Sequence, residues 1–180
     1  MSTSVLLLTN GATPAQPASG KTKLFINTSK RPAVIDDSGA VVALSGGEGT
    51  EQAQPGNPTA STSATGVMMG LAGSITPATT GRVLFFISGD VQNTNSATTS
   101  TIQLYYGTGT APANQAAITG SAIGSALKAS EAGAAQVLPF MVQAIVTGLT
   151  LGTAYWFDVS LAASANTSAI KDVSVTAFEI

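Results

Sequence analysis

Apolar and polar residues alternate with a period of two along most of this chain, and no long stretch carries apolar residues at helical spacing. Gly, Asn, Asp and Pro separate the alternating runs, as turn residues separate strands. The best helix candidate is a short Ala-rich segment, residues 125–132. Strands are predicted over residues 23–27, 32–35, 40–44, 68–75, 82–89, 99–106, 136–146, 154–161 and 173–177. The pattern therefore predicts an all-β protein.

The longer strands predict which side chains form the core. Residues 82–89 are apolar on both faces, whereas residues 154–161 alternate and carry Trp156 and Asp158 on the outward face. Pro139 inside another apolar run indicates a sheet edge or a bulge, because proline lacks the N–H that a central strand donates. Many short strands separated by turns are typical of a sandwich or a barrel. The predicted core contains Phe85, Ile102, Leu104, Phe140, Val142, Tyr155, Phe157 and Val159.

Composition divides the chain into three regions. Residues 1–44 contain an apolar string and a predicted β-hairpin, and residues 67–180 contain the longer strands. Residues 45–66 contain no apolar residue larger than Ala, which is typical of a flexible linker; the alternative is a long surface loop of one domain. We therefore expect an N-terminal attachment segment with a hairpin, a flexible linker and a C-terminal antiparallel β-sandwich.

The N-terminal region has more apolar side chains than a hairpin can cover. Residues 36–39 have the sequence of a tight turn, but an isolated hairpin is not stable in water. We predict that three copies pack around an axis, because this would cover the apolar side chains and the sheet edges. The predicted interface between copies consists of Leu24, Ile26, Val34, Val41 and Leu44. A separate apolar string, Val5, Leu6, Leu7 and Leu8, is predicted to anchor the chain to another protein.

Composition and charge exclude several classes of protein. Ala, Thr, Ser and Gly make up half of the chain, and only 9% of the residues are charged, against about 25% in an ordinary soluble domain. The chain has no Cys and no His, which excludes disulfides, ordinary zinc sites and Ser-His-Asp or Cys-His catalysis. A net charge of −2 argues against nucleic-acid binding. Because the apolar stretches are short and the start does not resemble a signal peptide, we expect no membrane insertion and synthesis in a cytoplasm.

Candidate chemical sites are few. Residues 15–22 match a relaxed phosphate-binding loop, but the residues that follow predict a strand instead of the helix that such a loop needs. Residues 125–128 match the Ser-x-x-Lys pattern of acylating enzymes without its companion motifs. Trp156, Asp158 and Tyr105 form a candidate glycan-contact surface, because an aromatic ring beside a carboxylate can bind a sugar. We predict no catalytic residue, no cofactor and no metal.

Two parts of the chain resemble surface proteins of bacteriophage virions, namely short tail fibres, head fibres and capsid decoration proteins. Residues 20–27 with residues 33–44 are similar to the small strand-turn-strand unit near the start of phage fibre proteins. Residues 147–160 with residues 172–180 are similar to the last strands of the trimeric jelly-roll head domains of such proteins. The resemblance implies a jelly-roll-like sandwich and a homotrimer, and it supplies no catalytic residues.

We therefore expect a non-enzymatic structural component of a phage virion: a trimeric surface fibre, spike or capsid decoration protein. It would be made in the host cytoplasm and located at the virion surface. Its N-terminal part would attach to other virion proteins of the capsid or tail, and its sandwich would project outward. The alternatives are a carbohydrate-binding adhesion module that contacts a host-surface glycan, and a glycan depolymerase that uses Asp158.

Overall fold

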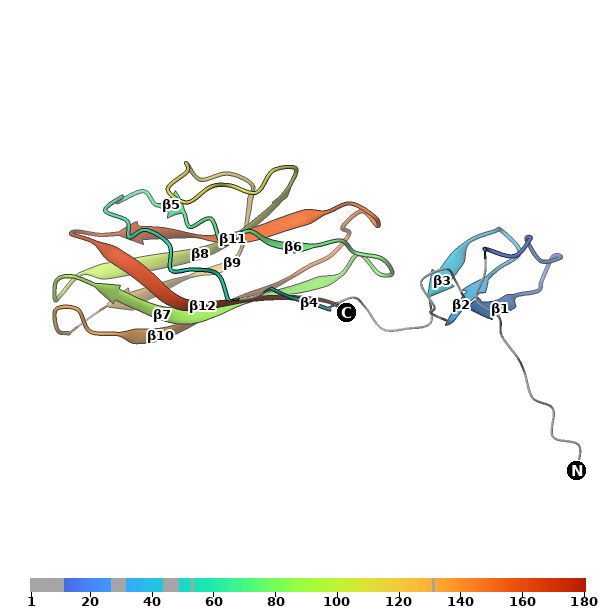
Figure 1. Cartoon of the computed structure of the whole chain (residues 1–180), viewed down its shortest axis with the longest axis horizontal. Helices are drawn as coiled ribbons and strands as arrows, with labels where there is room; N and C mark the ends of the chain where they lie inside the picture. Colours follow the sequence, from blue (N-terminus) through green and yellow to red (C-terminus); the bar gives the residue numbers. More distant parts are fainter. Residues whose placement is uncertain (1–11, 27–31, 44–48, 53, 131) are drawn as a thin grey trace, which may run out of the picture. The chain divides into compact units, whose positions relative to one another are not determined.

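The computed structural model describes residues 12–26, 32–43, 49–52, 54–130 and 132–180. The chain divides into two compact units, Met1–Gly46 and Gly47–Ile180, and each unit has its own sheets (Figure 1). Every regular element in the described residues is a β-strand, which confirms the all-β prediction. The described part of the chain accordingly offers no helix that could cross a membrane.

The first unit contains a three-stranded antiparallel sheet in the order β1-β2-β3. Its strands are β1 (Lys23–Ile26), β2 (Pro32–Ile35) and β3 (Val41–Ala43). Asp36 forms the turn between β2 and β3, because its carboxylate accepts hydrogen bonds from the Ser38 hydroxyl and from the backbone N–H of Ala40. These two bonds lower the pKa of Asp36. The buried core of this unit is small and consists of Phe25, Ala33 and Ile35.

The second unit is a sandwich of two antiparallel sheets, which form two layers in Figure 1. The first sheet has the order β10-β7-β12-β4, and the second has the order β5-β11-β8-β9, with β6 also paired to β11. The first sheet contains β4 (Gly49–Gln52), β7 (Val83–Asn93), β10 (Leu138–Val146) and β12 (Ser168–Glu179). The second contains β5 (Val67–Met68), β6 (Gly73–Ile75), β8 (Thr99–Thr108), β9 (Ser121–Ser130) and β11 (Tyr155–Ala163).

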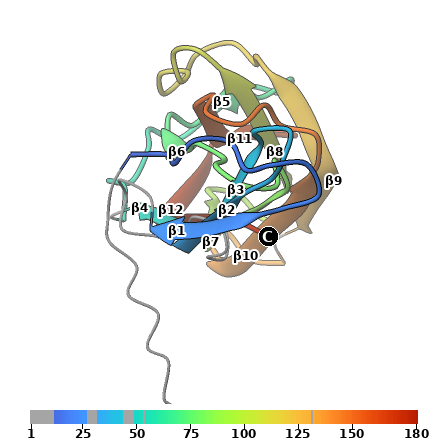
Figure 2. The ribbon, with the colours of Figure 1, turned by 90° about the vertical axis from the view of Figure 1, so that its right-hand side faces the viewer.

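The sandwich closes at one edge through β9 and β10, which lie side by side in Figure 2. Gly124 of β9 lies against Gln143 and Ala144 of β10. Pro139 lies in β10, which is an edge strand of its sheet, as the missing proline N–H predicts.

The core between the two sheets contains the side chains that alternation predicts. The rings of Phe85 and Phe157 lie 5.0 Å apart at its centre, and both side chains have no exposed surface. All eight predicted core residues are buried, with at most 9% of each side chain exposed: Phe85, Ile102, Leu104, Phe140, Val142, Tyr155, Phe157 and Val159.

The structure corrects the interpretation of residues 45–66 as a flexible linker. β4 pairs with β12 inside the first sheet, and Ser61 exchanges two backbone hydrogen bonds with Ser168 at 2.7 and 2.8 Å. Ser61 is fully buried. Small and polar residues attach this segment to the sandwich through backbone hydrogen bonds. The composition resembled that of a linker because such attachment needs no large apolar side chain.

The structure also corrects the helix candidate. Residues 121–130 form β9, which pairs with β8 along its length and has a register irregularity opposite Gln103. The Gln103 side-chain amide donates to the carbonyl of Ile123 at 2.7 Å and so occupies this irregularity. Ala has the highest intrinsic helix propensity, but propensity differences are under about 1 kcal/mol per residue, and pairing with an existing strand outweighs them here.

We predict that Phe157→Ala lowers the free energy of unfolding by about 3–5 kcal/mol, because it removes a fully buried ring from the centre of the core. Urea denaturation followed by tryptophan fluorescence measures the loss. Leu151→Ala is the matched control, because Leu151 is 51% exposed, and it should cost well under about 1 kcal/mol. Equal losses in the two variants would contradict the assigned facing of β11.

Candidate functional site

The outer face of the first sheet carries large apolar side chains that the described residues of the second unit leave half-buried or exposed. Alternation along β7 sends Val83 and Phe85 into the core, so Leu84 and Phe86 point to the other side of the sheet. The sequence signal for this arrangement was the run over residues 82–89, which is apolar on both faces. A strand of this kind is usually covered on both sides.

Neighbouring strands extend this apolar surface. Strand register places Leu84 between Ile145 of β10 and Phe178 of β12. Phe86 lies in the next outward-facing row, between Gln143 and Thr176, and Met141 lies in the row after that, opposite Ser88. The exposed fractions are 53% for Met141, 49% for Ile145 and 46% for Phe178. We call these five residues, Leu84, Phe86, Met141, Ile145 and Phe178, the apolar patch. Adjacent exposed side chains of this size mark interaction surfaces more often than isolated ones do.

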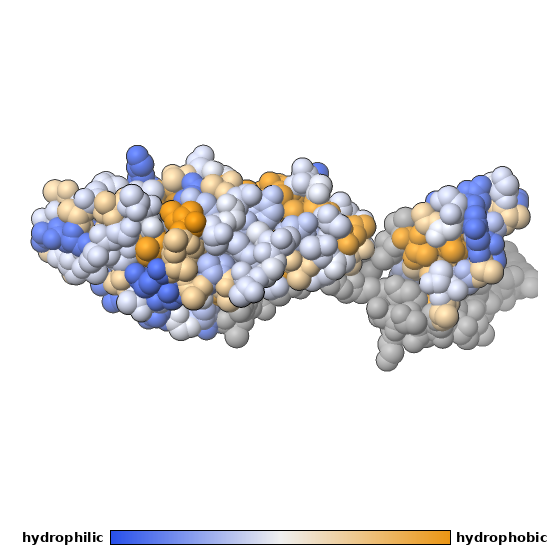
Figure 3. Space-filling model, turned by 90° about the horizontal axis from the view of Figure 1, so that it is seen from above, coloured by the Kyte–Doolittle hydropathy of each residue, from blue (hydrophilic) through white to orange (hydrophobic). Residues whose placement is uncertain are grey.

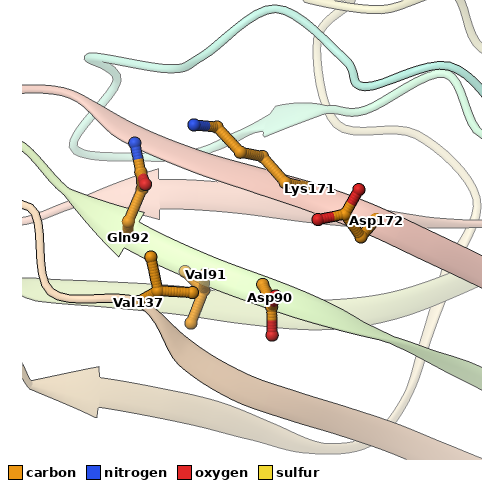
Figure 4. A pocket seen from close by; sticks show the side chains of 6 residues that line it. All are labelled: Asp90, Val91, Gln92, Val137, Lys171 and Asp172. Carbon is orange, nitrogen blue, oxygen red and sulfur yellow. The ribbon is translucent and has the colours of Figure 1, made fainter.

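A small cavity lies at the other end of the same face (Figure 4). Its volume is about 160 Å³. Asp90 of β7 lies opposite Lys171 of β12, and Asp172 follows at an irregularity in the register of β12. The lining residues are Asp90, Val91, Gln92, Val137, Lys171 and Asp172. Two carboxylates and one ammonium group give this end of the face a cluster of charged side chains.

The opposite sheet is covered by the chain itself. β5 and β6 pair with the edge of β11 that β8 leaves free. The loop between β8 and β9 lies against the outer side of β11, where Gly120 contacts the Trp156 ring, and it exchanges backbone hydrogen bonds with Met68 through Gln115 and Ala116. Every residue from Tyr155 to Leu161 is buried as a result. The face seen in Figure 3 accordingly carries its hydrophobic positions in small separate groups.

Asp158 lies on the predicted side of β11, away from the core cluster, but this cover corrects its expected accessibility, because the residue has no exposed surface. Its carboxylate accepts backbone N–H bonds from Gly70 at 2.8 Å, Leu71 at 3.1 Å and Val159 at 2.7 Å. Burial raises the pKa of Asp158 to about 6, although these N–H donors favour the ionised form. The side chain therefore fixes the residues between β5 and β6 to β11. It has no exposed surface with which to contact a glycan.

Trp156 is also buried, with 5% of its surface exposed. Its indole N–H donates to the carbonyl of Thr108 at 3.1 Å, and its ring lies against Gly107 and Gly120. At Gly120, φ is +79° and a Cβ atom would meet the indole at 2.4 Å, so the loop requires glycine there. Tyr105 lies directly opposite Asp158 on β8 and is half-buried. The three candidate glycan-contact residues are thus neighbours, but two of them are not accessible.

A second buried carboxylate, which sequence analysis did not single out, fixes the loop before β7. Glu179 is 4% exposed and accepts backbone N–H bonds from Ala78 and Thr79 at 2.8 Å and from Gly81 at 3.0 Å. It also accepts a backbone N–H bond from Thr80. Burial opposes ionisation of Glu179, but the N–H donors outweigh it and lower the pKa to about 2.

The predicted contact residues of the first unit are partly accessible. Leu24 is 42% exposed and Val41 is 45% exposed, whereas Ile26 and Val34 are half-buried. Leu44 and the predicted anchor, residues 5–8, lie outside the described residues. Apolar side chains of this unit are therefore available to a partner, and the three-fold contact stays a prediction.

No protein-family model matches this chain, and no curated protein matches it by sequence. Among the residues that the structure describes, no three acidic side chains gather as a metal site would require. The function is therefore inferred from the surfaces described above.

We predict that Glu179→Gln lowers the free energy of unfolding at pH 7 by about 2 kcal/mol, because the neutral amide is a weaker acceptor for the buried N–H groups. The pKa of Glu179 is lower in the folded than in the unfolded chain, so its contribution is present above pH 4.5 and is lost as the pH falls towards 2. Urea denaturation at pH 7 and pH 3 should show a smaller difference from the natural protein at pH 3. Asp172→Asn, at an exposed carboxylate, is the control. A difference that is the same at both pH values would contradict this role.

Proposed function

We propose that this chain is a non-enzymatic structural component of a phage virion. It acts as a homotrimeric surface fibre, spike or capsid decoration protein at the virion surface. The first unit and the residues before it attach to other virion proteins, and the sandwich projects outward.

The strand order of the sandwich carries this proposal. Consecutive strands pass between the sheets: β4 in the first, β5 and β6 in the second, β7 in the first, β8 and β9 in the second, β10 in the first, β11 in the second and β12 in the first. The sheet orders β10-β7-β12-β4 and β5-β11-β8-β9, with β6 also paired to β11, support a jelly-roll arrangement, in which eight strands form two sheets. Viral capsid domains are among the proteins that use this fold.

The first unit supports the assembly part of the proposal. Among the residues that the structure describes in this unit, the buried apolar cluster has three members, while Leu24 and Val41 remain about half-exposed. Small units with so little core usually need a disulfide, a metal or an oligomer for stability. The chain has no cysteine and no histidine, so contact between copies is the remaining means.

The alternatives lose their main support. A carbohydrate-binding module would need Trp156 and Asp158 at the surface, and both are buried. A depolymerase would need Asp158 to reach its substrate, but that carboxylate is occupied by backbone N–H groups. Lectin domains also use jelly rolls, so the strand order alone does not separate the two classes.

We predict a trimer of about three times the 17.9 kDa chain mass at micromolar concentration, measured by light scattering coupled to size exclusion. Val41→Asp should shift it towards monomer, because three carboxylates would then approach one another near the axis. Ala18→Asp adds the same charge at an exposed turn of the same unit and should leave the trimer intact. A well-folded monomeric natural protein would contradict the trimer.

Deletion of residues 2–11 tests virion attachment, because it removes the predicted anchor. The deletion stops before residue 12, since Lys23 donates to the carbonyl of Ala15 and the Gly20 N–H donates to Asp37. We expect a folded oligomer that no longer incorporates into particles assembled in infected cells. Immunoblots of purified particles measure incorporation, with the same deletion replaced by a polar sequence of equal length as control. Normal incorporation of the deleted chain would contradict the anchor.

A further inference from the structure

The apolar patch has oppositely charged groups at its two ends. Arg82 directly precedes β7 and lies on the same side of the alternation as Leu84 and Phe86. Asp90 lies on this same side of β7 at the far end, beside the cavity shown in Figure 4. Arg82 is exposed and Asp90 is half-buried, so both can meet a partner.

These charges are placed symmetrically about one residue. Phe86 lies four positions after Arg82 and four positions before Asp90. Each charge is therefore about 13 Å from Phe86 along the strand. A two-fold axis that runs parallel to the sheet, across the direction of β7 and directly over Phe86, turns a second copy face to face with the first and places Arg82 of one copy over Asp90 of the other. The same axis places the two Phe86 rings together and Leu84 over Ser88.

We propose that the outer face of the first sheet binds the same face of a second copy of this chain around this two-fold axis. The apolar patches of the two copies then cover each other, and Arg82 of each copy enters the cavity at Asp90 of the other. Two sheets packed face to face stand about 10 Å apart, which is within the reach of an arginine side chain. The contact goes beyond the proposed function, because it is separate from the three-fold contact proposed for the first unit.

Charge complementarity selects a second copy as the occupant. A lipid surface or an unrelated protein would need only the apolar residues, whereas the two-fold arrangement uses both charged ends in one contact. The cavity at Asp90 also contains Asp172, and its two carboxylates outnumber the single Lys171, so it favours an incoming cation. A patch of five large side chains is small for an interface, so the contact should be weak and dependent on concentration.

The decisive experiment exchanges the two charges in the full chain. Arg82→Asp alone and Asp90→Arg alone should each weaken the association at least tenfold, because each places like charges opposite each other. The double variant R82D/D90R should associate within about threefold of the natural protein, because it restores both pairs in the two-fold arrangement. Sedimentation velocity between 1 µM and 1 mM measures the association, and thermal unfolding checks that each variant is folded.

A second pair of variants tests the apolar part. The variant I145S/F178S should abolish the rise of mass with concentration, because it removes two half-exposed members of the patch. Leu151→Ser is the matched control, because Leu151 is 51% exposed in a loop outside the patch, and its association should be unchanged.

The outcomes separate this proposal from the proposed trimer. If the first unit trimerises, the mass at low concentration is that of a trimer and rises further with concentration only when the patch is intact. If it does not trimerise, an intact patch still gives a rise from monomer towards dimer. A double charge variant that associates no better than the single variants, or a natural protein with no rise in mass, would overturn the two-fold contact.

Discussion

The sandwich depends on the burial of β11 from both sides. One side of this strand faces Phe85 and the core, its other side lies under the loop between β8 and β9, and its free edge pairs with β5 and β6. The Asp158 carboxylate holds the residues between β5 and β6 through two backbone N–H bonds, from Gly70 and Leu71. A buried carboxylate is costly unless its acceptor sites are filled, so these residues and the charge stabilise each other.

The same cover gives the two outer faces of the sandwich different roles. The second sheet uses its own chain as a third layer, which removes Trp156 and Asp158 from solvent. The first sheet has no such layer in the described residues of its unit, and Met141, Ile145 and Phe178 are half-exposed there. Contacts with other molecules are therefore expected on the first sheet, and the glycan surface inferred from sequence falls on the covered one.

The low fraction of charged residues is consistent with one covered outer face and one apolar outer face. Only 9% of the residues are charged, and both fully buried carboxylates act as acceptors for loop N–H groups within the sandwich. Small side chains let backbone segments approach closely, as where Trp156 lies against Gly120 and where Ser61 pairs with Ser168. The protein thus obtains its rigidity from backbone hydrogen bonds and a compact aromatic core.

Sequence by itself determined most of the strands and the facing of the core residues, and it limited Pro139 to a sheet edge or a bulge, because a period of two and a missing proline N–H are local properties. It also showed that residues 82–89 are apolar on both faces. Only the tertiary structure decided that residues 49–52 and 54–66 belong to the sandwich, that residues 121–130 form a strand, and that Asp158 is buried. Alternation separates the two sides of a strand, but what lies beyond each side depends on segments far away in the chain, and those contacts leave no local pattern.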